Sequence, residues 1–347
     1  MNPNKKKWEV REMKQKDKKS FLTTEYYLAL FLVAILMIMA VYAKDFYSLN
    51  NMMSLLNTFS YILISAIGMN MIIITSNIDV STGALISVVC TFIAIIGKQG
   101  VPFIGLLVAA IFMGILLSTC NGIFITKMKI PAIVATLATT QIFQGILPLI
   151  VEGSIYDLPP SFTWLAFEAK LFGCVPVSVL ICLIVTVIAI VFMKYSRFSK
   201  KIYAIGNNAN AARLAGINVN KTIVITYAIA GALFGISAVI IATAGQRVTN
   251  TMGAGLEMTL IAAVVLGGTS TSGGSGRIIG TVIGAFILAM IAPAINYLGI
   301  SPNWAEAVKG TIIIASVVIS GAKYLKKKRV VDFNQVTPIS EQGGISQ

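Results

Sequence analysis

The sequence predicts an all-α polytopic membrane protein with about ten transmembrane helices and both termini in the cytoplasm. Composition is the first observation: apolar residues make up 56% of the 347 residues and charged residues only 12%, against roughly 25% charged in soluble domains. The mean hydropathy is +0.85. Because a hydrocarbon core about 30 Å thick needs about 20 apolar helical residues per crossing, a chain of this length has room for about ten crossings.

Ten apolar runs, separated by charges, Pro or Gly, are the second observation. They cover residues 26–43, 55–75, 84–97, 103–126, 133–151, 175–192, 223–244, 256–266, 278–295 and 305–319. The third and eighth runs are short for a full crossing, so we expect them to be tilted, broken or partly buried in protein. Spans two to five and seven to ten are candidates for an inverted repeat, an arrangement found in many transporters.

The distribution of basic residues is the third observation. Placing the N-terminus inside puts 22 of the 27 Lys and Arg residues on the inner side and 4 on the outer side, with Lys309 in the last run. Basic residues accumulate in short cytoplasmic loops, and nine or eleven spans would leave one basic tail outside. We therefore predict a cytoplasmic tail (1–25), a transmembrane domain (26–322) with a cytoplasmic segment (195–221), and a second cytoplasmic tail (323–347).

The net charge of +14 needs no nucleic-acid partner. The basic runs act as topology determinants that also meet the anionic headgroups of membrane lipid. No basic patch belongs to a soluble domain that could bind nucleic acid.

The sequence lacks the residues that several kinds of catalytic, metal-binding and phosphate-binding sites require. With no His in the chain, histidine acid-base catalysis and histidine metal sites are excluded. The four cysteines have no metal-ligand spacing and are expected to be small core residues: Cys90, Cys120, Cys174 and Cys182. The glycine-rich "GGTSTSGGSG" (267–276) lacks the Gly-Lys-Ser/Thr ending of a phosphate loop. We expect no catalytic residue, no metal and no cofactor bound by this chain itself.

Polar residues interrupt two apolar runs in "TSNIDVSTG" (75–83). An ionisable group embedded in a membrane costs several kcal/mol unless it is paired or hydrated, which makes Asp79 the best candidate for a functional role. Two interpretations stay open: Asp79 or Ser81 caps the following helix, or Asp79 acts directly in a pathway or in gating. The candidate pathway or gating residues are Asn77, Asp79, Ser81, Gln141 and Gln144.

Glycines recur at four-residue spacing in two spans. Gly231 and Gly235 lie in the seventh span, and Gly276, Gly280 and Gly284 lie at the start of the ninth. This spacing lets helix backbones approach closely.

The longest polar internal run is "KKIYAIGNNANAARLAGINVNK" (200–221), which the span count places in the cytoplasm. Within it "NNANAARLAG" predicts a short helix, capped by Asn207 or Asn208 and ended by Gly216 in a left-handed conformation. Its small side chains and Arg213 suit insertion into a groove of another protein. An ordinary connecting loop is the alternative.

This run resembles the cytoplasmic coupling region of permease subunits of bacterial ABC importers in the ribose-type sugar group. Three further stretches carry the same resemblance in the family's order: "GMNMIIITSNIDVSTGALISV" from Gly68, "KIPAIVATLATTQIFQGI" from Lys129 and "GAGLEMTLIAAVVLGGTSTSGGSGRIIGTVIGAFI" from Gly253. The likeness runs from about residue 55 to about residue 320. The wording of "KIPAIVATL" and "GAGLEM" is closest to the autoinducer-2 branch of the group.

The resemblance implies a multi-pass permease of the bacterial cytoplasmic membrane that imports a monosaccharide or autoinducer-2 by alternating access. It implies ABC ATPase subunits that use ATP and Mg, an extracytoplasmic substrate-binding protein, and a second permease copy or a sister permease. The residues that match the coupling pattern are Tyr203, Ala204, Gly206, Asn208, Ala211, Ala212, Arg213 and Gly216. The chain departs from the family at Ala209 and Asn210, where many relatives have Pro-Glu, and so lacks a first-turn Pro and an acid that favours the helix dipole. A secondary transporter or channel for a small polar solute is the alternative.

Overall fold

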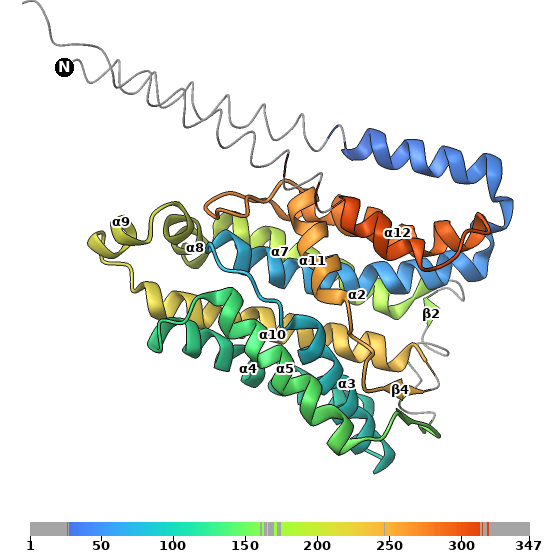
Figure 1. Ribbon diagram of the computed structural model, residues 1–347, viewed down its shortest axis with the longest axis horizontal. Helices are drawn as coiled ribbons and strands as arrows, with labels where there is room; N and C mark the ends of the chain where they lie inside the picture. Colours follow the sequence, from blue (N-terminus) through green and yellow to red (C-terminus); the bar gives the residue numbers. More distant parts are fainter. Residues whose placement is uncertain are drawn as a thin grey trace, which may run out of the picture.

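The computed structural model describes residues 26, 28–159, 162, 165, 170–171, 175–245, 247–312, 314 and 318. The predicted cytoplasmic tails, 1–25 and 323–347, lie outside the described residues. Figure 1 shows long helices running side by side, with α8 and α9 at one end of the bundle and β2 and β4 at the other.

The described chain is predominantly helical. Its elements are the helix Leu28–Tyr42, η1 (Lys44–Tyr47), α2 (Leu49–Ile74), α3 (Thr82–Lys98), α4 (Phe103–Lys127), α5 (Ala132–Ile150), β1 (Ser154–Ile155), β2 (Lys170–Leu171), β3 (Val175–Pro176), α7 (Val177–Tyr195), α8 (Arg197–Asn207), α9 (Ala209–Leu214), α10 (Val219–Thr243), β4 (Val248–Thr249), α11 (Leu256–Leu266) and α12 (Ile278–Tyr297). The strands form two short antiparallel pairs, β1 with β4 and β2 with β3.

Each of the first nine predicted apolar runs coincides with one helix, and the eighth run matches α11 at both ends. Six of these helices, α2, α4, α5, α7, α10 and α12, are long and apolar enough to cross a membrane. Three are shorter: Leu28–Tyr42, α3 and α11. Of the tenth run, residues 305–312 are helical, and most of the remainder lies outside the described residues. The protein is therefore a helical polytopic membrane protein.

The core of the bundle is built by α2, α10 and α12. In their most apolar windows, 78%, 61% and 61% of the residues are buried, against 22% in each of α4, α5 and α7. Many polar side chains inside the bundle bond to carbonyls of their own or neighbouring helices, as Ser118 of α4 does to the carbonyl of Tyr227 in α10 (2.8 Å). The inner helices are thus shielded from the surroundings, and the outer three each expose a face.

Glycines allow two helix pairs to pack backbone to backbone. A Cβ at Gly231 or Gly235 of α10 would overlap the carbonyls of Gly114 and Ala110 in α4. A Cβ at Gly280 or Gly284 of α12 would likewise overlap the carbonyls of Gly267 and Ala263, at the end of α11. Gly276 differs from the expected pattern: it precedes α12, which begins at Ile278, and belongs to the loop between the two helices.

Candidate functional site

The polar segment after α7 folds into two helices rather than one. Ser196 begins α8 by accepting a hydrogen bond from the N–H of Phe198 (3.0 Å). Asn208 then begins α9 by accepting from the N–H of Ala211 (3.0 Å), so the capping residue of the short helix is Asn208 and not Asn207.

The far end of α9 closes with a Schellman motif. Gly216 has a left-handed backbone, with φ of 80°. The N–H of Ile217 donates to the carbonyl of Ala212, and that of Gly216 to the carbonyl of Arg213, both at 3.0 Å. Both ends of this six-residue helix are therefore satisfied locally, without a partner.

The helix α8 lies against the rest of the protein. Its Ile202 and Ile205 are buried, and the hydroxyl of Tyr203 donates to the carbonyl of Gly276 (2.8 Å). Burial raises the pKa of the Tyr203 phenol above its usual value, and the nearby charge of Arg277 lowers it to a lesser extent. The phenol therefore stays neutral and remains a hydrogen-bond donor. Of the residues that match the coupling pattern, Tyr203 and the partly buried Ala204 belong to this support rather than to an exposed surface.

Three segments far apart in the sequence meet at the C-terminal end of α8, in what we name the glycine junction: Ile74, Ser76, Gly206, Asn207 and Gly274. The N–H of Gly274 donates to the carbonyl of Ile74 (2.9 Å). The Ser76 hydroxyl lies within hydrogen-bond distance of the carbonyls of Gly206 (3.2 Å) and Ser272 (2.9 Å). A Cβ at Gly206 would overlap the Ile74 carbonyl, so only glycine lets α8 approach so closely.

A second set of bonds ties the loop to the interior, one helical turn deeper. The amide of Asn70, inside α2, donates to the hydroxyls of Thr269 (2.7 Å) and Thr281 (2.8 Å), and all three side chains are buried. Thr269 lies in the glycine-rich loop and Thr281 in α12. The segment α8–α9, the end of α2, the loop and the start of α12 are therefore connected by direct hydrogen bonds.

The side chains of α9 point in opposite directions. Ala212 is buried against the chain, with 4% of its surface exposed, whereas Ala211, Arg213 and Leu214 are exposed. Leu214 is 91% exposed, the largest fraction among the exposed large apolar side chains of the described residues. Sequence reasoning missed Leu214, although a lone Leu in a polar segment was a usable signal.

Asp79 is fully buried and organises the turn before α3. Its Oδ1 accepts from the N–H (2.9 Å) and the hydroxyl (2.6 Å) of Ser81. The amide of Asn121 in α4 donates to the same Ser81 hydroxyl (2.7 Å). Asp79 thus orders the entry to α3 and links it to α4, while Ser81 itself makes no side-chain cap bond to the helix. Asn77 bonds locally to Thr75. Asp79 and Ser81 lie inside the bundle and not on an open surface.

Gln141 and Gln144 lie elsewhere, on the exposed side of α5. Residues three apart share a face of a helix, so the two amides form one polar patch. Beside them, a Cβ added at Gly145 would meet no atom within 4 Å. The structure therefore does not bring the glutamines together with Asp79.

A cavity of about 340 Å³ lies between α2, α10, α11 and α12, next to the helical segment 304–312. Its polar lining was not predicted and comprises Thr58, Tyr61, Thr259, Asn296 and Lys309. Lys309 also contacts Glu306 (2.8 Å). Hydroxyl, amide and ammonium groups in a cavity of this size fit a small polar solute.

Comparison with known proteins places these features in context. The family described as "Branched-chain amino acid transport system / permease component" matches residues 51–317. The ribose import permease protein of Escherichia coli (strain K12) is 34% identical over 303 residues, which cover 84% of this chain and 93% of the relative. That of Bacillus subtilis (strain 168) is 33% identical over 298 residues, 86% of this chain and 92% of the relative. No solved structure matches the chain.

An autoinducer-2 relative is also similar. The autoinducer 2 import system permease protein of Yersinia enterocolitica serotype O:8 is 29% identical over 291 residues, 84% of this chain and 80% of the relative. This supports the resemblance to the ribose and autoinducer-2 group. The expected placement nearest the autoinducer-2 branch is not favoured by these identities, which are higher for the two ribose relatives.

Proposed function

This chain belongs to the permease family described as "Branched-chain amino acid transport system / permease component", and from that premise we propose which of its parts drives transport and what it moves. It is a multi-pass protein of the bacterial cytoplasmic membrane and the membrane-spanning subunit of an ABC importer. It carries a small polyhydroxylated solute, a monosaccharide or autoinducer-2, as the names of its relatives indicate. Those relatives are matched over 80–93% of their length.

The observation that carries the mechanism is the contrast between α9 and its support. The helix α9 is capped at both ends and exposes Arg213 and Leu214, while α8 is hydrogen-bonded to Ser76, just after α2, and to the loop before α12. An exposed leucine on a preformed helix fits an apolar groove of a partner. We assign that partner to the ATPase subunit, with Asn208, Ala211 and Gly216 shaping the helix.

A displacement of α9 would then reach the membrane helices through a short chain of direct contacts. Closure of the ATPase subunits around ATP and Mg²⁺ pushes on α9, α8 moves with it, and the glycine junction passes the shift to α2 and α12. The spans tip between outward-facing and inward-facing states, which is alternating access. The chain itself binds no cofactor and breaks no covalent bond.

The proposed topology has about ten spans with both termini cytoplasmic. Two features support an inverted repeat of spans two to five and seven to ten. In each set the second helix is the short one, α3 or α11. The turn that enters α3 follows the end of α2 near α8, whereas the entry to α11 follows β4, at the opposite end of the bundle (Figure 1). An extracytoplasmic binding protein docks at the β4 end, and a second permease completes a central pathway.

The test separates docking from folding. In proteoliposomes with the cognate ATPase and binding protein, Arg213→Glu and Leu214→Asp are expected to lower ATP-driven uptake at least about tenfold, because each puts a carboxylate into the proposed groove. Lys201→Glu, a charge reversal at another exposed position, on α8, serves as the matched control. Normal uptake in both α9 variants would refute the docking role. Ala212 is unsuitable for this test because it is buried in its own chain.

A secondary transporter or channel is the alternative function, and the same vesicles distinguish it. An importer of the proposed kind shows no solute accumulation when the ATPase subunits are omitted. Calorimetry on the cognate binding protein addresses the solute: ribose or autoinducer-2 is expected to bind, and leucine, the kind of solute in the family's description, is expected not to bind.

A further inference from the structure

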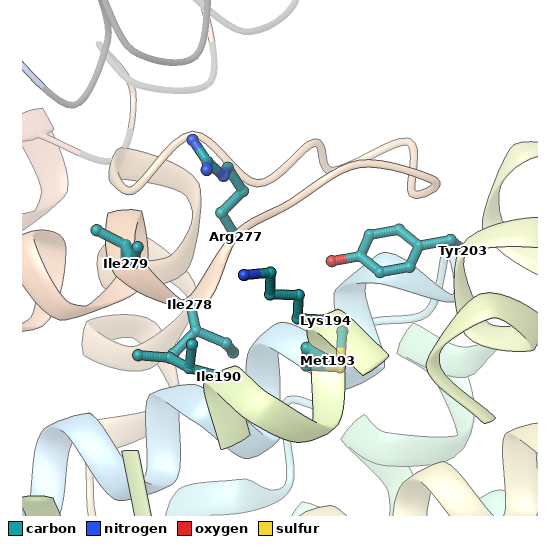
Figure 2. A pocket seen from close by; sticks show the side chains of 7 residues that line it. All are labelled: Ile190, Met193, Lys194, Tyr203, Arg277, Ile278 and Ile279. Atoms are coloured by element: carbon teal, nitrogen blue, oxygen red, sulfur yellow. The ribbon is translucent and has the colours of Figure 1, made fainter. Parts of the chain in front are cut away.

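A second cavity of about 340 Å³ opens where α7 ends, between α7, α8 and the start of α12 (Figure 2). Its lining combines apolar and basic side chains: Ile190, Met193, Lys194, Tyr203, Arg277, Ile278 and Ile279. Among these lining residues none is acidic. The cavity is distinct from the exposed face of α9 and from the polar cavity at Lys309.

The charges and the apolar groups lie on different parts of the wall. In Figure 2 the hydroxyl of Tyr203 points toward the side chain of Lys194, and Arg277 lies above them with its guanidinium directed upward. Ile190, Ile278 and Ile279 lie on the side away from Tyr203. Two cations above an apolar floor complement a molecule with an anionic head and a hydrocarbon tail.

The helix that leads into this cavity, α7, exposes an apolar face. Along α7 the exposed side chains are all apolar through the middle of the span, with 49–61% exposure at Leu183, Ile184, Val187, Ile188 and Val191. Lys194 follows in the last turn of the same helix. A lipid whose acyl chains lie along this face would bring its headgroup to Lys194 and Arg277. Basic pockets between transmembrane helices on the cytoplasmic side suit such headgroups.

We propose that this cavity binds the phosphate headgroup of an anionic phospholipid. The lipid bridges α7, which carries Lys194, to Arg277, the residue just before α12, and it lies beside Tyr203 of α8. The Tyr203 hydroxyl holds α8 to the carbonyl of Gly276. A headgroup bound beside it therefore stabilises the packing of α8 against the loop before α12, next to the glycine junction.

Lipid titration of the purified full-length chain in detergent tests this site. Native mass spectrometry would measure binding of phosphatidylglycerol to the wild type, to Lys194→Gln/Arg277→Gln and to Arg197→Gln/Lys201→Gln. The last is a matched control, since it removes one Arg and one Lys from exposed positions of α8 outside the cavity. At about 1 kcal/mol per basic residue, the cavity variant should bind roughly 10- to 30-fold more weakly, and the control should bind like the wild type.

Further measurements distinguish a lipid headgroup from free phosphate, and a single variant keeps the test informative if the double variant does not fold. Phosphatidylcholine and inorganic phosphate should fail to raise the thermal stability that phosphatidylglycerol raises. If the double variant does not fold, Lys194→Gln alone changes an exposed side chain and should weaken binding about fivefold. Equal binding by the cavity variants and the wild type, an equal loss in the control, or equal stabilisation by inorganic phosphate would each overturn the proposal.

Discussion

The helices α5 and α7 are matched in size and exposure but not in polarity. Each has 19 residues and 22% of its most apolar window buried, yet the mean hydropathy of that window is 1.6 in α5 and 2.8 in α7. The exposed middle of α7 is apolar throughout, whereas α5 exposes Gln141 and Gln144. Equal exposure in one protomer therefore does not mean the same surroundings.

The physical reason is the cost of an unsatisfied amide in hydrocarbon. Without a hydrogen-bond partner a buried amide costs several kcal/mol, and two such groups on one face would destabilise a lipid-facing helix. We infer that α7 faces lipid and that the glutamine face of α5 meets the solute pathway or the second permease. The open space beside Gly145 fits that inference, because it leaves room for another molecule.

The largest expected difference between α5 and α7 is in the stability lost when a lysine is placed at the middle of each helix. Val187→Lys and Gln141→Lys both lie near the middle of their helices. A lysine at the centre of a lipid-facing span costs about 2.5–3.5 kcal/mol, so Val187→Lys should strongly reduce the folded, membrane-embedded protein. Gln141→Lys should cost less than about 1 kcal/mol, because it faces water or polar groups. Fluorescence-detected size-exclusion chromatography of solubilised membranes measures the yield of folded protein. Similar losses in both variants would contradict the inference that the two helices face different surroundings.

The sequence predicted the helices well because a span is a local property. Apolar length determines a crossing, and nine helices appear where the apolar runs predicted them. The short helix α9 was also predictable, since Asn208 and Gly216 act on neighbouring backbone groups. The helix α8 was missed although it carries apolar residues, such as Ile202 and Ile205, between its charged ones. Its position depends on a non-local contact, the packing of Gly206 against Ile74.

The connections of the site could not be read from one sequence. Asn70 and Thr269 are 199 residues apart, and nothing local indicates that one bonds the other. The orientation of α9, which buries Ala212 and exposes Leu214, likewise depends on where α8 and α10 place it. For the same reason the apolar runs of α5 and α7 both predicted a span, and neither predicted which faces would be exposed.

A smaller difference between α5 and α7 is expected in the rate at which cysteines on their exposed faces react with a water-soluble reagent. In a background in which Cys90, Cys120, Cys174 and Cys182 are replaced by Ser, single cysteines at positions 141 and 187 report on the two faces. The thiolate, which forms in water and hardly at all in hydrocarbon, is the nucleophile that attacks a membrane-impermeant thiol-specific reagent. Gln141→Cys should react at least about tenfold faster than Val187→Cys, and Gln144→Cys should follow Gln141→Cys. Equal rates at 141 and 187 would show that the glutamine face of α5 is as poorly accessible to water as the exposed face of α7.

The smallest expected effect is on uptake when the amides of α5 are removed, and it distinguishes the solute pathway from the second permease as the neighbour of this helix. Gln141→Leu and Gln144→Leu nearly conserve volume and remove the amide, so each should lower uptake about fivefold if it loses one hydrogen bond worth about 1 kcal/mol. Val187→Leu, a volume change on the lipid face, should leave uptake unchanged. Cross-linking of the permease pair in the same vesicles decides the cause: an intact pair with reduced uptake assigns the amides to the solute pathway, whereas a dissociated pair assigns them to the second permease. Unchanged uptake with an intact pair in both variants would show that the polarity of α5 serves neither, and the contrast with α7 would lose its functional meaning.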